Sequence, residues 1–292
     1  MPSPVPRSGR RKRVNPTRAS ACSKVGRFPL GEKQRSVQAE ITILGSGTSM
    51  GVPTLGCACR VCTSPDPRDR RTRPSIAVTW AEHRVLIDTG PDFREQALRE
   101  GINHVDAVFY THSHADHIFG LDDLRPLSFK NKNKIPLYAD DAAAIVIERV
   151  FDYTFDTAAS YPTRARVEMH RLGQSVEVEG AVFHRVPLTH GRIEVAGFRF
   201  GNAAYLTDMS SIPESSLSLL ENLDVVIIDA LRKRPHPSHA TLGQALEFVR
   251  QLQPRRAFFT HMSHDLHHAD TNSELPGHIR LAYDGLRIPF EI

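Results

Sequence analysis

Long apolar stretches are absent from this chain of 292 residues. Runs such as Val225–Ile228 have the length of a strand, far below the roughly 18–20 residues of a membrane span, so no membrane partner is expected. Cysteine is scarce, and four residues do not make a disulfide scaffold. A hydrophobic share of 40% and a charged share of 24% exclude collagen-like and wholly disordered chains. No secretory hydrophobic region is found, and a cytoplasmic location is expected.

Positive charge is concentrated at the start of the chain. Residues 1–38 contain ten Lys and Arg and a single acid, so the remaining residues carry a net charge of −5. The segment lacks an apolar period, which predicts a disordered basic tail over 1–38. A transit peptide, a polyanion-binding arm or a misassigned start codon would fit the same composition. One domain is expected over 39–292, and its negative charge disfavours nucleic acid as a partner.

Strand-like and helical patterns alternate from Ile41 onward, which predicts a layered α/β domain with helices outside the sheets. Helices are expected near 92–100, 141–150 and 239–251, and residues 152–170 are expected to be irregular. The expected strands are Ile41–Leu44, Ser75–Trp80, Arg84–Ile87, Val105–Tyr110, Ile135–Ala139, Ala181–Leu188, Gly197–Phe200, Ala203–Thr207, Asp224–Asp229 and Arg256–Thr260.

A dense cluster of metal-binding side chains follows the strand Val105–Tyr110. It has the pattern His-x-His-x-Asp-His, at His112, His114, Asp116 and His117. The first two histidines can face one point in space, whereas the aspartate and the last histidine lie on the next turn and can face a second. Imidazole and carboxylate are suitable ligands for Zn²⁺, Mn²⁺ or Fe²⁺. The cluster therefore predicts a metal centre.

Three further candidate ligands follow later strands. They are His190, Asp208 and His261. Taken singly, each has an ordinary interpretation as a capping or hydrogen-bonded polar residue. Because all three follow apolar strands, and because a metal needs four to six ligands, we expect them to complete the centre.

These residues resemble the pattern of the metallo-β-lactamase-fold metallohydrolases. The likeness covers roughly residues 41–290 and includes the loop Gly45–Thr48 and Asp88. It implies an αββα sandwich with two metals at the sheet edge, and it implies that Asp88 orients ligand groups. The resemblance assigns one metal to His112, His114 and His190, the other to Asp116, His117 and His261, and both to Asp208.

A second motif, Cys-x-Cys-x-x-Cys, contains Cys57, Cys59 and Cys62. Three thiolates so close favour a soft tetrahedral metal and need a fourth ligand. A disulfide interpretation would leave one cysteine over. Structural zinc is therefore expected, with His264 as the fourth ligand.

The cysteine motif followed far downstream by His261 and His264 is similar to the phosphoribosyl 1,2-cyclic phosphate phosphodiesterases. That resemblance implies one structural zinc, two active-site metals (manganese or zinc), a small phosphodiester substrate and a homodimer. The implied reaction is hydrolysis of a cyclic phosphodiester by a hydroxide that the two metals share. Asp116 and Asp208 would then belong to the catalytic group as well as to the ligand set.

Two residues are candidates for contact with the substrate. His239 matches the family's catalytic histidine and is the expected general acid at the start of a helix; a partly buried helix-start histidine is the alternative. Arg125 could bind a second phosphate, whereas pairing with Asp122 or Asp123 would make it part of the scaffold.

Three other functions compete with the diesterase. An RNA-processing endonuclease has the same ligands, but the domain is acidic and no basic glycine-rich insertion is found. Hydrolysis of a thioester, lactam or other ester is a further alternative. An inactive zinc-stabilised scaffold is disfavoured because every expected ligand position is filled.

Overall fold

The computed structural model describes residues 37–131, 133–156 and 163–292. The predicted tail lies outside the described residues except for positions 37 and 38. Strand β1 (Gln38–Gly45) begins one residue before the expected domain boundary. No helix in the described ranges is both long enough and apolar enough to cross a membrane.

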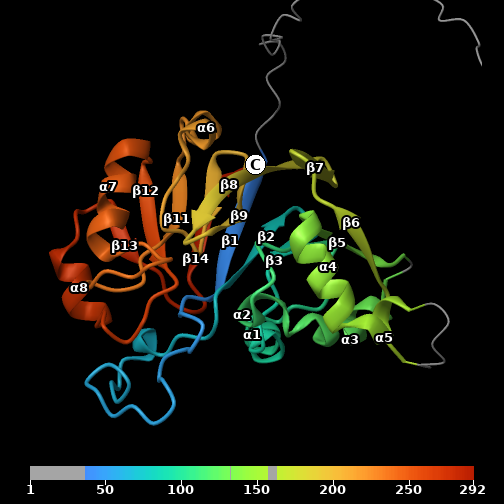
Figure 1. Cartoon of the computed structure of the whole chain (residues 1–292), viewed down its shortest axis with the longest axis horizontal. Coiled ribbons are helices and arrows are strands. Elements are labelled where there is room, and N and C mark those ends of the chain that lie inside the picture. The colour runs from blue at the N-terminus through green and yellow to red at the C-terminus, as the bar shows by residue number, and fades with distance from the viewer. Residues whose placement is uncertain (1–36, 132, 157–162) are drawn as a thin grey trace, which may run out of the picture. The chain divides into compact units, whose positions relative to one another are not determined.

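The described strands form two seven-stranded sheets (Figure 1). The first has the order β14 (Arg287–Glu291), β1, β2 (Ser75–Trp80), β3 (His83–Ile87), β4 (Ala107–Phe109), β5 (Ile135–Ala139) and β6 (Val167–Arg171). The second has the order β13 (Ile279–Leu281), β12 (Arg256–Thr260), β11 (Val225–Asp229), β10 (Ala203–Leu206), β9 (Ile193–Phe200), β8 (Ala181–His190) and β7 (Ser175–Val178).

Helices cover the outer faces of both sheets (Figure 1). Beside the first sheet lie α1 (Phe93–Arg99), α2 (Ala115–Ile118), η2 (Leu121–Leu124), α3 (Arg125–Ser128), α4 (Asp141–Val150) and α5 (Asp152–Phe155). Beside the second lie α6 (Glu214–Leu217), η3 (Ser218–Leu220), α7 (Leu242–Leu252) and α8 (His268–Glu274), and η1 (Pro67–Asp69) lies in the long β1–β2 connection.

The sheets pack face to face through aromatic side chains. Phe109 of β4 stacks on Phe183 of β8, with ring centroids 4.9 Å apart, and lies 5.3 Å from Phe198 of β9. The preceding residue, Val108, belongs to the outer cluster with Ile147 of α4. Strands covered on both faces must be apolar at successive positions, which explains their continuous hydrophobic runs. The predicted αββα sandwich is confirmed.

The carboxyl ends of parallel strands lie at the edge that carries the polar residues. β3 to β6 are parallel in the first sheet, as are β10 to β13 in the second. Three site residues come just after these strands: Asp88 after β3, Asp208 after β10 and His261 after β12. Each has a left-handed backbone, with φ of 66°, 53° and 57° respectively. Non-glycine residues adopt this conformation at a cost, and such strain is concentrated at functional sites.

Two expectations about elements were wrong. Residues 152–170 are not wholly irregular, because they contain α5 and β6. His239 does not open a helix, since α7 begins at Leu242 behind a capping box in which Thr241 and Gln244 bond to each other's backbone. His239 therefore lies in the loop before the cap.

Candidate metal centre

The histidine cluster is positioned by the end of β4 and by a buried aspartate. Thr111 donates hydrogen bonds from its backbone nitrogen and its hydroxyl to the two oxygens of Asp88, both at 2.9 Å. His114 has an extended backbone at the start of α2, and this helix contains Asp116 and His117, both of which are buried. The local backbone thus directs the cluster toward the opposite sheet.

Seven side chains form two groups that share one member. One group contains His112, His114, His190 and Asp208, and the other contains Asp116, His117, Asp208 and His261; within each group the ligand atoms lie within 4.8 Å of one another. The structure therefore brings together the seven residues that the sequence singled out. Their role as metal ligands stays a prediction.

The separations within the second group suit a divalent cation. Asp208 Oδ1 lies 3.2 Å from His117 Nε2 and 3.4 Å from His261 Nε2, and Asp116 Oδ2 lies 3.3 Å from His117 Nε2. A tetrahedral ion with bonds of about 2.1 Å separates its ligand atoms by roughly 3.4 Å. The observed distances match that spacing.

Several of these atoms are buried and have no hydrogen-bond partner within the described chain. They are His112 Nε2, His117 Nε2, His261 Nε2 and Asp116 Oδ2. Burial of an unpaired polar atom is costly, so each needs a partner of another kind. One cation in each ligand group would satisfy all four atoms, and the residues present therefore fit the metals that the fold family implies.

Hydrogen bonds to the other ring nitrogens orient the imidazoles. His117 Nδ1 lies 2.7 Å from Asp88 Oδ2, and His190 Nδ1 lies 2.8 Å from the carbonyl oxygen of Ser238. Because a carboxylate and a carbonyl only accept, each Nδ1 carries the proton and each Nε2 is left with a lone pair. These rings are thereby fixed in the tautomer that binds metal through Nε2.

The buried carboxylates dominate the electrostatics. Burial opposes protonation of His117, but Asp208 and Asp116 raise the pKa of that imidazole well above its usual value. Burial likewise disfavours a charged Asp208, yet His261 and His117 hold the pKa of this carboxyl well below its usual value. For His112 the balance is reversed. Burial outweighs the attraction of Asp208 and lowers the pKa of this imidazole well below its usual value. A field that attracts protons to imidazoles also attracts a divalent cation, which would displace those protons.

His239 lies beside both ligand groups. Its ring stacks on His261 at 4.5 Å between centroids and lies 4.6 Å from His190. Its Nδ1 is 2.8 Å from Oδ2 of Asp229, the last residue of β11, which also accepts a bond from the backbone nitrogen of Met209. Nδ1 is thus engaged, and Nε2 is the nitrogen left to exchange a proton with a substrate.

Sequence reasoning missed Asp229. The signal was available, because Asp229 ends an apolar strand as the other site residues do. Its side chain is wholly buried and one oxygen lacks a hydrogen-bond partner in the described residues. A buried carboxylate at such a strand end is itself an indication of a functional partner.

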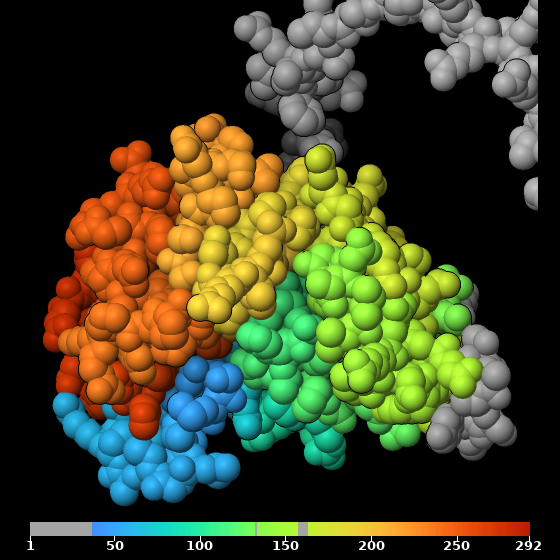
Figure 2. All heavy atoms as spheres, in the orientation of Figure 1, coloured from blue at the N-terminus to red at the C-terminus, as the bar shows by residue number. Residues whose placement is uncertain are grey.

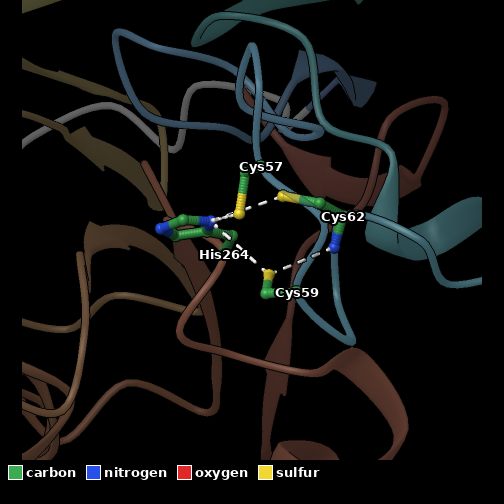
Figure 3. A group of neighbouring side chains, drawn as sticks. All are labelled: Cys57, Cys59, Cys62 and His264. Carbon is green, nitrogen blue, oxygen red and sulfur yellow. Dashed lines mark hydrogen bonds between the residues drawn. The ribbon is translucent and has the colours of Figure 1, made fainter.

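Cys57, Cys59, Cys62 and His264 form a separate group (Figure 3). The three sulfurs lie 3.2, 3.6 and 3.3 Å from His264 Nδ1. Zinc bonds of about 2.3 Å to sulfur and 2.0 Å to nitrogen would place these atoms roughly 3.5 Å apart. Backbone N–H groups of Cys62 and Thr54 also point at sulfurs, at 3.5 and 3.3 Å. The geometry suits a closed tetrahedral zinc site.

The thiols of this group differ in acidity. The backbone N–H of Cys62 contributes most to lowering the pKa of Cys59 to about 7. Burial raises the pKa of Cys62 to about 11. Zinc binds thiolates, so its binding at neutral pH would release protons from this group.

Among the described residues, no hydrogen bond or ion pair joins Arg125 to either metal group. Its Nη2 lies 3.6 Å from Asp122 Oδ2, and its Nη1 donates to the carbonyl oxygen of Thr163 at 3.4 Å. The observed partners favour the scaffold interpretation of Arg125 over a phosphate contact.

Residues 83–262 match the model of the Beta-lactamase superfamily domain. The chain belongs to this family, and its fold and site define it as a metallo-β-lactamase-fold metallohydrolase. Its sequence is 52% identical to that of a protein whose crystal structure is described as a new diphosphatase from the PhnP family. The two structures have a TM-score of 0.84, over 88% of this chain and 99% of that one.

Other relatives carry different names. An octanoyltransferase of Porphyromonas gingivalis (strain W83) is 39% identical over 84% of this chain and 50% of its own length. The chain thus spans about half the length of the curated relatives it matches. Zn²⁺-bound PqqB from Methylobacterium extorquens has a TM-score of 0.69 at 20% identity, over 85% of this chain and 99% of that one, and shows the fold alone.

Proposed function

We propose that this protein is a metal-dependent phosphoric ester hydrolase that cleaves a small cyclic phosphodiester, with phosphoribosyl 1,2-cyclic phosphate as the candidate substrate. The observation that carries the proposal is the pair of ligand groups that share Asp208, with His239 in contact with both. The 52% identity to a PhnP-family diphosphatase, covering 99% of that chain, supports it.

The chemistry divides between the bound metals and the side chains. Two divalent cations held by these residues would polarise a phosphoryl oxygen and lower the pKa of a water molecule. The protein's own contribution is to hold the ligands in place through Asp88 and Ser238, and to deliver a proton. His239 Nε2 would protonate the leaving oxygen, while Asp229 holds the ring through Nδ1 and stabilises its charged form.

The same proposal names the occupants of the sites. Manganese or zinc would occupy the paired groups, which offer imidazole and carboxylate. Zinc would occupy the thiolate group. We further propose that the protein acts as a cytoplasmic homodimer.

A second candidate is hydrolysis of a phosphoanhydride. It is favoured by one observation, the description of the 52% identical relative as a diphosphatase. A metal-held phosphoryl group is common to both reactions, and the difference is the leaving group. A phosphate leaving group needs less protonation than a sugar alkoxide, so dependence on His239 distinguishes the two.

The test is a screen of the metal-loaded protein. Substrates are phosphoribosyl 1,2-cyclic phosphate, cyclic nucleotides, bis(p-nitrophenyl) phosphate, a nucleoside diphosphate derivative, RNA and a thioester. We expect turnover of the cyclic phosphodiester, and none by the His114→Ala variant. Cleavage of RNA or the thioester alone would overturn the proposal, as would equal turnover by that variant.

A further inference from the structure

A fully buried ion pair lies in the β1–β2 connection, the segment that also carries the three cysteines. Arg71 Nη2 lies 3.0 Å from Asp69 Oδ1, and neither side chain has any solvent exposure. Burial lowers the pKa of Arg71, which reflects how unfavourable this environment is for a charge. Buried ion pairs are tolerated when every donor and acceptor is satisfied by geometry of good quality.

Most of the remaining hydrogen bonds of these two side chains go to one distant segment; the exception is Arg71 Nε, which donates to the carbonyl oxygen of Arg68 at 3.4 Å. Arg71 Nη1 donates to the carbonyl oxygen of Ser263 at 2.8 Å, and Nη2 donates to that of Leu266 at 2.5 Å. Asp69 Oδ1 accepts from the backbone nitrogen of His268 at 2.8 Å. In Figure 2 the residues of the cysteine-bearing segment (blue) form a lobe against the C-terminal part of the chain.

These three backbone groups lie on both sides of His264. The segment between β12 and α8 has no regular secondary structure to fix its path. Instead, the guanidinium of Arg71 and the carboxylate of Asp69 bind two carbonyl oxygens and one N–H group of this segment. The same segment begins with His261, so it contributes His264 to the cysteine group and His261 to one of the two groups that share Asp208.

Backbone hydrogen bonds extend from this segment to the residue that follows the expected proton donor. Ser263 donates from its nitrogen to Leu231 at 2.9 Å, and Leu231 donates to Ala240, which follows His239, also at 2.9 Å. The ion pair therefore connects through three successive hydrogen bonds to the residue beside the expected general acid.

We propose that the Arg71–Asp69 pair is a positioning element that presents His264 to the cysteines and sets the path of the segment shared with His261. The proposal rests on the proposed metal sites. Arginine is required because its planar fork reaches two carbonyls and a carboxylate at once, whereas the point charge of lysine cannot.

The test uses the full-length chain with Arg71→Lys, which retains the charge, and Asp69→Asn, which retains an oxygen acceptor, as a second variant. The matched control is Arg68→Lys, because the exposed Arg68 side chain pairs with Asp66 and makes no bond to residues 263–268. Zinc retention is measured by competition with a chromogenic chelator, and the cobalt-substituted protein is measured by absorption. Circular dichroism shows that each variant is folded.

We expect Arg71→Lys to weaken zinc retention about 10–100-fold, the usual effect of removing a group that supports a metal ligand, and to alter the thiolate–cobalt absorption. Asp69→Asn should act in the same direction, and Arg68→Lys should match the wild type. Wild-type zinc retention and an unchanged cobalt spectrum in folded Arg71→Lys or Asp69→Asn would overturn the proposal. Neither readout uses a substrate. Failure of the proposed hydrolase function would therefore not change this result, and the two failures can be told apart.

Discussion

His239 and Asp229 form a dyad in which Nδ1 of the imidazole lies 2.8 Å from a carboxylate oxygen that is wholly buried. The carboxylate comes from the end of β11 and the histidine from the loop before α7. Because Asp229 occupies Nδ1, the ring is held with Nε2 available beside the two metal groups. This arrangement is suited to donating a proton to a leaving oxygen.

The first prediction concerns that proton. His239→Ala should lower kcat by roughly 10²–10⁴-fold for a diester with an alkyl leaving group, the usual contribution of a general acid. The loss should be smaller with p-nitrophenolate, which leaves without help. Steady-state kinetics on both substrates measures the difference. His236→Ala, a neighbouring histidine 5.1 Å away between ring centroids, is the control. Equal losses on both substrates would contradict the assignment.

The second prediction tests whether Asp229 acts through His239. Asp229→Asn should lower kcat for the alkyl substrate because the ring loses its charged partner. In the double variant with His239→Ala, the Asp229 substitution should add little, since residues that act as a unit are not additive. Independent, multiplicative losses would show that Asp229 has another role.

The third prediction concerns the thiolate group. Cys59→Ser should remove one zinc per chain and lower the free energy of unfolding, because metal binding at a closed site contributes directly to folding. The two metals of the paired groups should remain. Elemental analysis and denaturant unfolding measure these effects, with Cys22→Ser, outside the described residues, as the matched control. Loss of all metals together would argue against two separate sites.

The fourth prediction is a pH dependence of stability. Burial lowers the pKa of His268 from 6.5 to about 4. A histidine with a lowered folded pKa stabilises the protein above its unfolded pKa of 6.5, and that stability is lost as the pH falls from 6.5 toward 4. The full loss is about 3 kcal/mol.

His268→Leu should therefore lose less unfolding free energy than the wild type between pH 7 and pH 5, as measured by denaturant titration at each pH. His278→Leu, at an exposed histidine, is the control and should follow the wild type. A parallel decline in wild type and His268→Leu would refute the prediction.

The sequence predicted the central elements well where burial is strong. Both β5 (Ile135–Ala139) and α4 (Asp141–Val150) have the expected bounds, because their patterns are clear and Asp140 caps the helix through the nitrogen of Ala143. β6 was missed because only Val167 of that strand is buried. Its pairing with β5 at the sheet edge stabilises it, and a single sequence does not show such tertiary pairing.

The seven candidate ligands could be predicted from the sequence because they follow apolar strands. The structure brings all seven together. Asp229 had the same signal but lacked a neighbouring motif. The Arg71–Asp69 pair had no signal, because its partners are backbone groups nearly 200 residues away. Such long-range contacts are visible only once the chain is folded.

The most direct test of the account is the metal content of the wild type and of Asp208→Ala, measured by inductively coupled plasma mass spectrometry on protein prepared without chelators. Asp208 is the side chain that the two groups share. The account predicts about three metals per chain in the wild type and about one, the thiolate-bound zinc, in the folded variant, with turnover abolished. An unchanged metal content in Asp208→Ala, or a wild type that binds only one metal, would contradict it.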